Sequence, residues 1–210
     1  MDSEPPHHSF INEMIARMRI QPRDRILDVG CGKGWAGRLL AELVPEGLVV
    51  GVDISEQMVH NARAKSAACE NLMFILGEAD DIPWQNDFFS KVLSVDAFYY
   101  FENAEKALQE IRRVMSPGGS LWILNPISKE NELSLRQLAD LKVAVHLRSA
   151  EEYGALFEQC GFVGYEYQMI PDCAPVSKES WTPTPLPGNP GEDQRFRELG
   201  ALLMTARKKG

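Results

Sequence analysis

The segment ILDVGCGKGWAG, residues 26–37, joins a carboxylate to closely spaced glycines directly after an apolar run. Two glycine patterns overlap in this segment. Gly32, Gly34 and Gly37 satisfy G-x-G-x-x-G, which is typical of dinucleotide binding. The other pattern, D-x-G-x-G-x-G, is satisfied by Asp28, Gly30, Gly32 and Gly34. The two patterns predict different cofactors, so the position of the acid has to distinguish them.

The position of Asp28 favours a cationic ligand. The apolar run predicts a strand that carries this acid at its carboxyl end, where a pyrophosphate would otherwise approach. A carboxylate there suits S-adenosylmethionine, which has a sulfonium and an ammonium group and no phosphate. The glycines at positions 30, 32 and 34 allow close approach of the backbone, and the N-terminus of the following helix favours the carboxylate of the ligand.

Asp53 ends a second apolar run, LVVGVD, and lies 19 residues after Gly34. An acid at this place accepts hydrogen bonds from the hydroxyls of a ribose. It would serve the nicotinamide ribose of NAD equally well. An NAD-dependent oxidoreductase is therefore the alternative to a methyltransferase, although it rests only on Gly32, Gly34, Gly37 and Asp53.

Further motifs extend this pattern along the chain, in the segments GVDISEQMVHNAR, GEADDIPW and ALQEIRRVMSPGGSLWI. Together with ILDVGCGKG, they resemble the class I S-adenosylmethionine-dependent methyltransferases, in particular the small-molecule group that includes the ubiquinone and menaquinone C-methyltransferases. The resemblance covers about residues 22–125 with specific motifs and residues 149–170 more loosely. It implies an α/β, Rossmann-like seven-stranded sheet of order 3-2-1-4-5-7-6, with strand 7 antiparallel and helices on both faces.

The resemblance also implies S-adenosylmethionine as cofactor and assigns its contacts. Asp53 matches the ribose-binding acid, and Glu78 and Ala79 match the residues that lie against the adenine, with Asp80 as their neighbour. Glu78 replaces the commoner Asp and is one methylene longer. Met58 lies at helical spacing from Asp53, where a core residue is commoner than a cofactor contact. The predicted cofactor-binding residues are Asp28, Gly30, Gly32, Gly34, Asp53, Ile54, Met58, Glu78, Ala79, Asp80 and Val95.

The acceptor side is predicted at the end of the fourth strand, the switch-point edge where an open α/β sheet binds ligands. The segment DAFYYF follows this strand. Its aromatic residues either stack on a substrate or pack against the next helix, and the sequence does not favour one of these roles over the other. It differs from the sequence of the quinone enzymes, so their substrate does not transfer to this chain. The substrate candidates are Asp96, Tyr99, Tyr100, His146 and Trp181.

No catalytic residue is assigned from the sequence. Methyl transfer from a sulfonium is an in-line displacement with a neutral leaving group, so the protein mainly holds donor and acceptor within about 3–3.5 Å of each other. A general base is needed only when the acceptor is an unionised hydroxyl or a carbon acid. The function expected is methyl transfer to a small molecule, with the acceptor atom left open.

Short apolar runs alternate with helical repeats along the chain, as in a parallel α/β sheet. Strands are predicted over residues 25–30, 48–53, 72–76, 90–96, 120–124, 163–170 and 201–207. Helices are predicted over residues 9–20, 39–43, 55–68, 104–115 and 149–160, the last beginning with a Ser149–Glu152 capping box.

A single domain over residues 1–210 is expected, because no internal repeat or second core is visible. We divide it into an N-terminal helix (1–21), a cofactor-binding core (22–125), a substrate cover with a helical apolar stripe (126–148) and a proline-rich loop (171–198). Six prolines between positions 171 and 190 predict that this last segment forms neither helix nor central strand.

Composition excludes several classes of protein. The net charge of −8, from 30 acidic and 22 basic residues, disfavours a nucleic-acid partner. The four cysteines form no C-x-x-C pair, which argues against zinc and disulfide frameworks and favours a reducing compartment. No apolar stretch is long enough to span a bilayer. We therefore expect a cytoplasmic monomer or homodimer that acts on a small molecule, without a metal.

Overall fold

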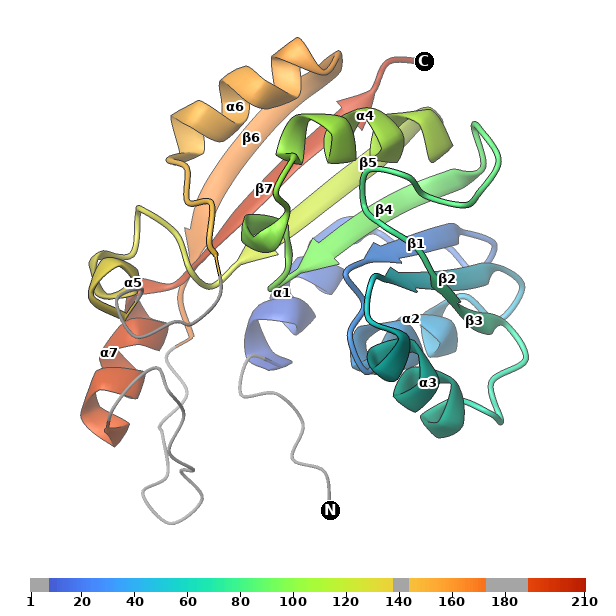
Figure 1. The fold of residues 1–210 in the computed structure, drawn as a ribbon, viewed down its shortest axis with the longest axis horizontal. Coiled ribbons are helices and arrows are strands. Elements are labelled where there is room, and N and C mark those ends of the chain that lie inside the picture. The colour runs from blue at the N-terminus through green and yellow to red at the C-terminus, as the bar shows by residue number, and fades with distance from the viewer. Residues whose placement is uncertain (1–7, 138–143, 173–188) are drawn as a thin grey trace.

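The computed structural model describes residues 8–137, 144–172 and 189–210, which form one seven-stranded sheet flanked by helices (Figure 1). The strands are β1 (Arg25–Val29), β2 (Leu48–Asp53), β3 (Leu72–Leu76), β4 (Phe89–Val95), β5 (Met115–Asn125), β6 (Phe162–Ile170) and β7 (Ala201–Lys208). Their order is β3-β2-β1-β4-β5-β7-β6, with β1 to β5 parallel and β7 antiparallel to both neighbours. The predicted fold class and strand order are confirmed.

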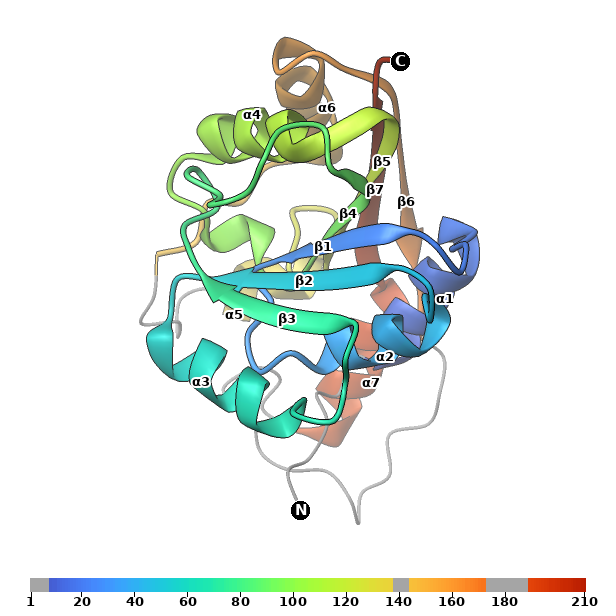
Figure 2. The ribbon, with the colours of Figure 1, turned by 90° about the vertical axis from the view of Figure 1, so that its right-hand side faces the viewer.

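Helices cover both faces of the sheet, as predicted (Figure 2). One face carries α1 (His8–Met18), α2 (Trp35–Leu43) and α3 (Glu56–Lys65), and the other carries α4 (Ala104–Val114) and α6 (Ala150–Gln159). The elements η1 (Phe98–Tyr100), α5 (Glu132–Gln137) and α7 (Pro190–Leu199) contribute to a third apolar cluster around Tyr99 and Phe196. Buried apolar side chains on both faces explain why β2 is an uninterrupted apolar run.

Local capping fixes where the helices begin. Ser55 accepts a hydrogen bond from the backbone N–H of Met58 and caps α3, which begins at Glu56, one residue after the predicted start. The Ser149–Glu152 capping box is confirmed at the start of α6. Both caps stand at the carboxyl edge of the sheet, where the helix N-termini face the candidate site.

The substrate cover differs from the prediction. Within the described residues, the helical stripe predicted over residues 127–148 is wrong at both ends, because α5 begins at Glu132 and residues 144–149 have no regular structure. Tertiary hydrogen bonds compete with the helix here. The Asn131 side chain donates to the carbonyls of Phe196 and Gly200, and the backbone N–H of His146 donates to the carbonyl of Tyr99.

The proline-rich loop predicted over residues 171–198 is also wrong at its end, because α7 begins at Pro190. Proline fits the first helical position, since the backbone N–H that it lacks has no partner within the helix there. The side chain of Asn189 caps the helix by accepting from the N–H groups of Gly191 and Glu192. The last of the six counted prolines, Pro190, therefore starts a helix.

Strand β5 is longer than expected, because pairing extends back to Met115 instead of beginning at residue 120. A register shift in its pairing with β4, between Phe89 and Lys91, accommodates the S-P-G-G turn. Gly118 has a φ of 74°, a left-handed conformation that glycine adopts without steric cost. The turn lies at the amino edge of the sheet, away from the candidate site.

The strand order places the candidate residues at one edge. Strand β1 lies between β2 and β4, so the chain reverses its direction of propagation at the carboxyl end of β1. Ligands of open α/β sheets bind at such a switch point. Among the described helices, none is long and apolar enough to cross a membrane.

Candidate active site

Three glycines after β1 adopt left-handed backbone conformations, with φ of 76°, 52° and 72° at Gly30, Gly32 and Gly34. A Cβ atom at Gly30 would lie 2.5 Å from the Cβ of Ala97, and one at Gly34 would lie 2.3 Å from the ring of Phe74. At Gly32, by contrast, a Cβ would meet nothing within 4 Å. Gly30 and Gly34 therefore let the protein pack against itself, whereas Gly32 borders open space that can receive a ligand.

Strand β2 holds this turn in place. The carbonyl of Val52 accepts from the N–H groups of Gly30 and Cys31, at 2.8 and 3.1 Å. Asp53 then uses both carboxylate oxygens, accepting from the N–H of Gly32 at 2.8 Å and from the N–H of Ser55 at 2.9 Å. Asp53 is thus fixed between the glycine turn and the start of α3.

Asp28 is buried beside this turn, and its Oδ2 has no hydrogen-bond partner among the described residues. Burial, followed by the negative charge of Asp53, raises the pKa of the Asp28 carboxyl to about 7. Two carboxylates at the end of adjacent strands disfavour a pyrophosphate and favour a cation. The structure therefore supports the acid-containing glycine pattern over the dinucleotide pattern.

The remaining cofactor candidates surround the same edge. Ile54 is 71% exposed although it is apolar, and Met58 is half-buried on the first turns of α3. The loop after β3 is tied to β2 because the N–H of Gly77 donates to the carbonyl of Asp53 at 3.1 Å. The next residues of that loop are Glu78, which is exposed, and Ala79 and Asp80, which are half-buried, while Val95 ends β4.

The acceptor candidates after β4 form a compact group. The Tyr99 hydroxyl donates to Oδ1 of Asp96, whose φ of 55° is unusual for a residue other than glycine. Tyr99 is buried, and burial raises the pKa of its hydroxyl well above the usual value. The Tyr100 ring packs against it in a tilted arrangement, with 4.5 Å between the ring centroids, and Tyr100 is 40% exposed. Tyr99 therefore packs the core and holds Asp96, and Tyr100 is the aromatic residue accessible to a ligand.

His146 joins this group, since its backbone N–H donates to the carbonyl of Tyr99 at 2.8 Å. It helps to line a cavity of about 360 Å³ with Lys129, Leu147, Arg148 and Glu152. The remaining substrate candidate, Trp181, lies outside the described residues. No cluster of three or more His, Cys, Asp or Glu side chains that could hold a metal ion occurs in the described part of the chain.

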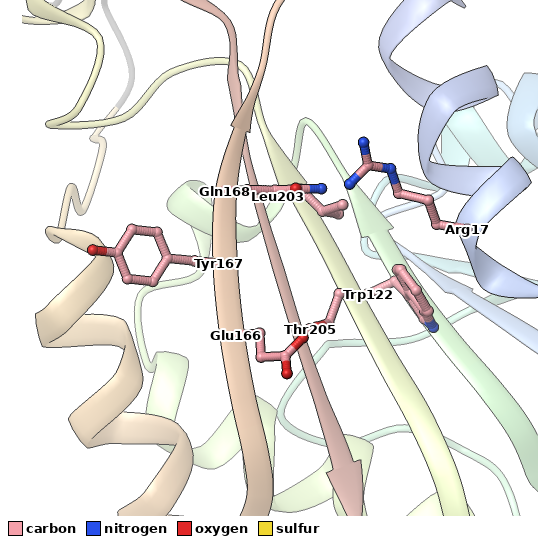
Figure 3. Close-up of a pocket in the computed structure, with 7 residues that line it drawn as sticks. All are labelled: Arg17, Trp122, Glu166, Tyr167, Gln168, Leu203 and Thr205. Atoms are coloured by element: carbon pink, nitrogen blue, oxygen red, sulfur yellow. The ribbon is translucent and has the colours of Figure 1, made fainter.

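A second cavity, of about 230 Å³, lies on the sheet face that carries α1, between this helix and strands β5, β7 and β6 (Figure 3). Arg17 and Trp122 border it, and the ring of Tyr167 points away from Arg17. The glycine turn contributes no residue to it. This cavity is therefore separate from the candidate site.

Several residues at the site were not singled out from the sequence. Ala97 approaches Gly30, the Ser55 backbone binds Asp53, and the fully buried Asn125 ends β5. Asn125 carried a visible signal, because a polar residue directly follows the apolar run of a strand at the ligand-binding edge. The contacts of Ala97 and Ser55 carried none, since they depend on backbone geometry.

The fold and the site define a Rossmann-like domain that binds a nucleotide-type cofactor at the switch point of its sheet. A family model described as a methyltransferase domain matches residues 20–173. The chain therefore belongs to the methyltransferase domain family.

Known proteins agree with this assignment. Demethylmenaquinone methyltransferase of Symbiobacterium thermophilum is 38% identical over 111 residues, which cover 51% of this chain and 44% of that protein. The chain thus spans less than half the length of this curated relative. A chain in a complex with the Trm112 methyltransferase activator of Haloferax volcanii superposes with a TM-score of 0.84 at 29% identity, covering 97% of this chain and 90% of that one.

A third match shows the fold alone. Phosphoethanolamine N-methyltransferase 2 of Haemonchus contortus, solved in complex with S-adenosyl-L-methionine, gives a TM-score of 0.72 at 18% identity and covers 97% of this chain and 53% of that one. None of these three proteins is named as an oxidoreductase. The family assignment therefore does not favour the NAD-dependent alternative.

Proposed function

We propose that this chain is an S-adenosylmethionine-dependent methyltransferase that transfers a methyl group to a small-molecule acceptor by in-line displacement. The observation that carries the proposal is the buried Asp28 carboxyl, whose Oδ2 lacks a partner beside the negative charge of Asp53. A cationic ligand supplies the missing counter-charge, whereas a dinucleotide would add negative charge. Family membership independently supports methyl transfer.

The residues present fit this cofactor. Gly32 borders open space at the N-terminus of α2, where backbone N–H groups favour a carboxylate. Asp53 keeps lone pairs available to ribose hydroxyls while it holds the turn, and the exposed side chain of Ile54 offers an apolar surface to a ring. When bound, the cofactor supplies a methyl group already activated on a sulfonium. The chain itself orients the ligand, balances its charge and excludes water.

Calorimetric titration tests the proposal. We expect S-adenosylmethionine and its demethylated product to bind with micromolar affinity or better and NADH not to bind. Absence of binding by both methionine-derived ligands at high micromolar concentration would contradict the proposed function. Saturable NADH binding would favour the oxidoreductase instead.

Replacing Asp53→Ala should weaken cofactor binding by at least about tenfold, because one charge-assisted hydrogen bond contributes about 1.5–3 kcal/mol. Asp53 also holds Gly32 and Ser55, so the thermal midpoint of each variant has to be recorded with its affinity. Glu56→Ala, an exposed acid in the first turn of α3, is the matched control and should bind normally. Unchanged affinity in Asp53→Ala would show that the ribose lies elsewhere.

We also propose which partners the protein has and where in the cell it acts. The acidic net charge of −8 supports a small-molecule acceptor and argues against nucleic acid. We expect a cytoplasmic protein that is a monomer or homodimer, and the three described cysteines are free thiols, as in a reducing compartment. Light scattering after size exclusion measures the mass of the particle, and cell fractionation locates it. A larger particle or a membrane-bound fraction would contradict these expectations.

A further inference from the structure

Buried polar atoms without partners are concentrated in one region of the molecule. Nine such side-chain atoms occur among the described residues, and six of them lie near the ends of β4 and β5 and the start of α6. These six atoms belong to Ser94, Asn125, Ser128, Glu130 and Tyr153. Buried polar groups in native proteins nearly always find a partner, so this concentration indicates a ligand or ordered water. We call these five residues the polar cluster.

The residues of the polar cluster come from three segments, namely the end of β4, the end of β5 with the loop after it, and the start of α6. Ser94 and Asn125 lie on the sheet face that α6 covers, because side chains two residues apart in a strand share a face. Ser94 lies two residues after Val92, and Asn125 lies two residues after Ile123, and both of these apolar residues belong to that core. The loop after β5 is tied to α6, since Oε1 of Glu130 accepts from the N–H of Ala150 at 2.6 Å. The same loop and helix are also joined by the pair Lys129–Glu152 at 2.7 Å.

The start of α6 also contacts the segment after β4. The Tyr153 ring lies 5.7 Å from that of Phe98, and Arg148 lies 6.0 Å from the Tyr153 ring. Arg148 and Glu152 line the cavity of about 360 Å³ that also includes His146. The polar cluster thus lies next to that cavity and beside Asp96, on the acceptor side of the sheet.

We propose that the polar cluster is the acceptor subsite and that it binds a small molecule carrying hydroxyl or amino groups. This inference rests on the proposed function. The free Oε2 of Glu130 can only accept a hydrogen bond when ionised, so it requires a donor on the ligand. Asn125 offers both a donor and an acceptor, and the three hydroxyls adapt to either.

The hydrogen-bonding groups of the polar cluster exclude an acceptor that would place a long apolar chain there. An apolar group in the polar cluster would leave all six atoms without partners. Sites built for hydrogen bonds reject analogues that lack them by factors of about 10⁴–10⁵. Residues 144–149 have no regular structure, and three of them, His146, Leu147 and Arg148, line the adjacent cavity.

Three variants test the proposal. Asn125→Leu and Ser94→Ala remove polar atoms that have no partner in the folded protein, and Ser66→Ala removes a similarly buried and unpartnered hydroxyl at the far end of α3. We expect all three to keep the cofactor affinity and to keep or raise the thermal midpoint. Methyl transfer from tritiated S-adenosylmethionine to catechol and aminophenol acceptors should fall at least about tenfold in kcat/KM in Asn125→Leu and Ser94→Ala only.

The outcomes separate the inference from the function on which it rests. Failure to bind the cofactor contradicts the proposed function. Normal cofactor binding with methylation of thiophenol, which carries neither a hydroxyl nor an amino group, and equal rates in wild type and Asn125→Leu, overturns the polar subsite alone. Loss of stability in Asn125→Leu and Ser94→Ala without loss of methyl transfer also overturns it, because that result indicates structural water.

A readout without turnover covers acceptors that react slowly. The side-chain amide signal of Asn125, assigned by its absence in Asn125→Leu, is followed by nuclear magnetic resonance in the complex with S-adenosylhomocysteine. We expect the signal to shift on titration with catechol or aminophenol and not with thiophenol, which has neither a hydroxyl nor an amino group. No shift with any polar probe would overturn the proposal.

Discussion

At the scale of single residues, Asp28 gives the site its pH dependence. Its pKa rises from 3.8 to about 7 on folding, so the folded protein binds an extra proton between these values. Stability therefore falls as pH rises through this window and is constant above it. Asp28→Asn should stabilise the unliganded protein relative to wild type by about 3 kcal/mol more at pH 8 than at pH 5. Urea denaturation at both pH values measures this difference, and equal differences at both would contradict it.

Gly32 and Gly34 should respond differently to alanine, although both have left-handed backbones. Either substitution costs about 1–2 kcal/mol from the left-handed conformation alone. Gly34→Ala should cost more, because its Cβ would collide with Phe74, whereas the Cβ at Gly32 enters open space. We therefore expect Gly34→Ala to lose more stability and Gly32→Ala to lose mainly cofactor affinity. Thermal melts and calorimetry separate the two effects, and equal losses of stability would contradict the assignment of Gly32 to the ligand.

Sequence could identify these residues but not their environments. The spacing of the glycines and the acids placed them at one edge, because parallel strands end together. It could not show that Asp53 spends both oxygens on backbone N–H groups, or that Tyr99 is buried while Tyr100 is exposed. Those properties depend on Gly32, Ser55 and the apolar cluster around Phe196, which approach from other parts of the chain.

At the scale of elements, the strands were predictable because their apolar runs are short and bounded by turns, and only the early start of β5 was missed. The connections were harder. The apolar stripe after Pro126 suggested one long helix, but the buried side chain of Asn131 instead donates to the carbonyls of Phe196 in α7 and of Gly200, the residue that caps α7. A helical repeat cannot reveal such a competing tertiary contact.

Helix α7 offers a test at this scale. Asn189 accepts two backbone N–H groups at its start, at 3.0 Å each. Asn189→Ala should destabilise the protein by about 1 kcal/mol, the usual value of such a cap, whereas Asn189→Asp should be nearly neutral. Urea denaturation with both variants measures this, and equal stability of Asn189→Ala and wild type would show that α7 contributes little to the fold.

At the scale of the whole molecule, the sheet couples the cofactor edge to global stability. The glycine turn is hydrogen-bonded to β2, and the loop after β3 is hydrogen-bonded to Asp53, so these connections share one set of contacts. A ligand that binds only the folded chain at 100 times its Kd adds about 2.7 kcal/mol, which corresponds to a Tm increase of about 5–10 °C for a domain of this size. S-adenosylhomocysteine should produce this increase and NADH should not.

Hydrogen exchange should slow mainly in residues 30–34 and 53–58 and the loop at 77–81, while the amino edge around Gly118 and the cavity beside Arg17 stay unchanged. Protection centred on that second cavity instead would place the ligand on the wrong face of the sheet for the proposed function.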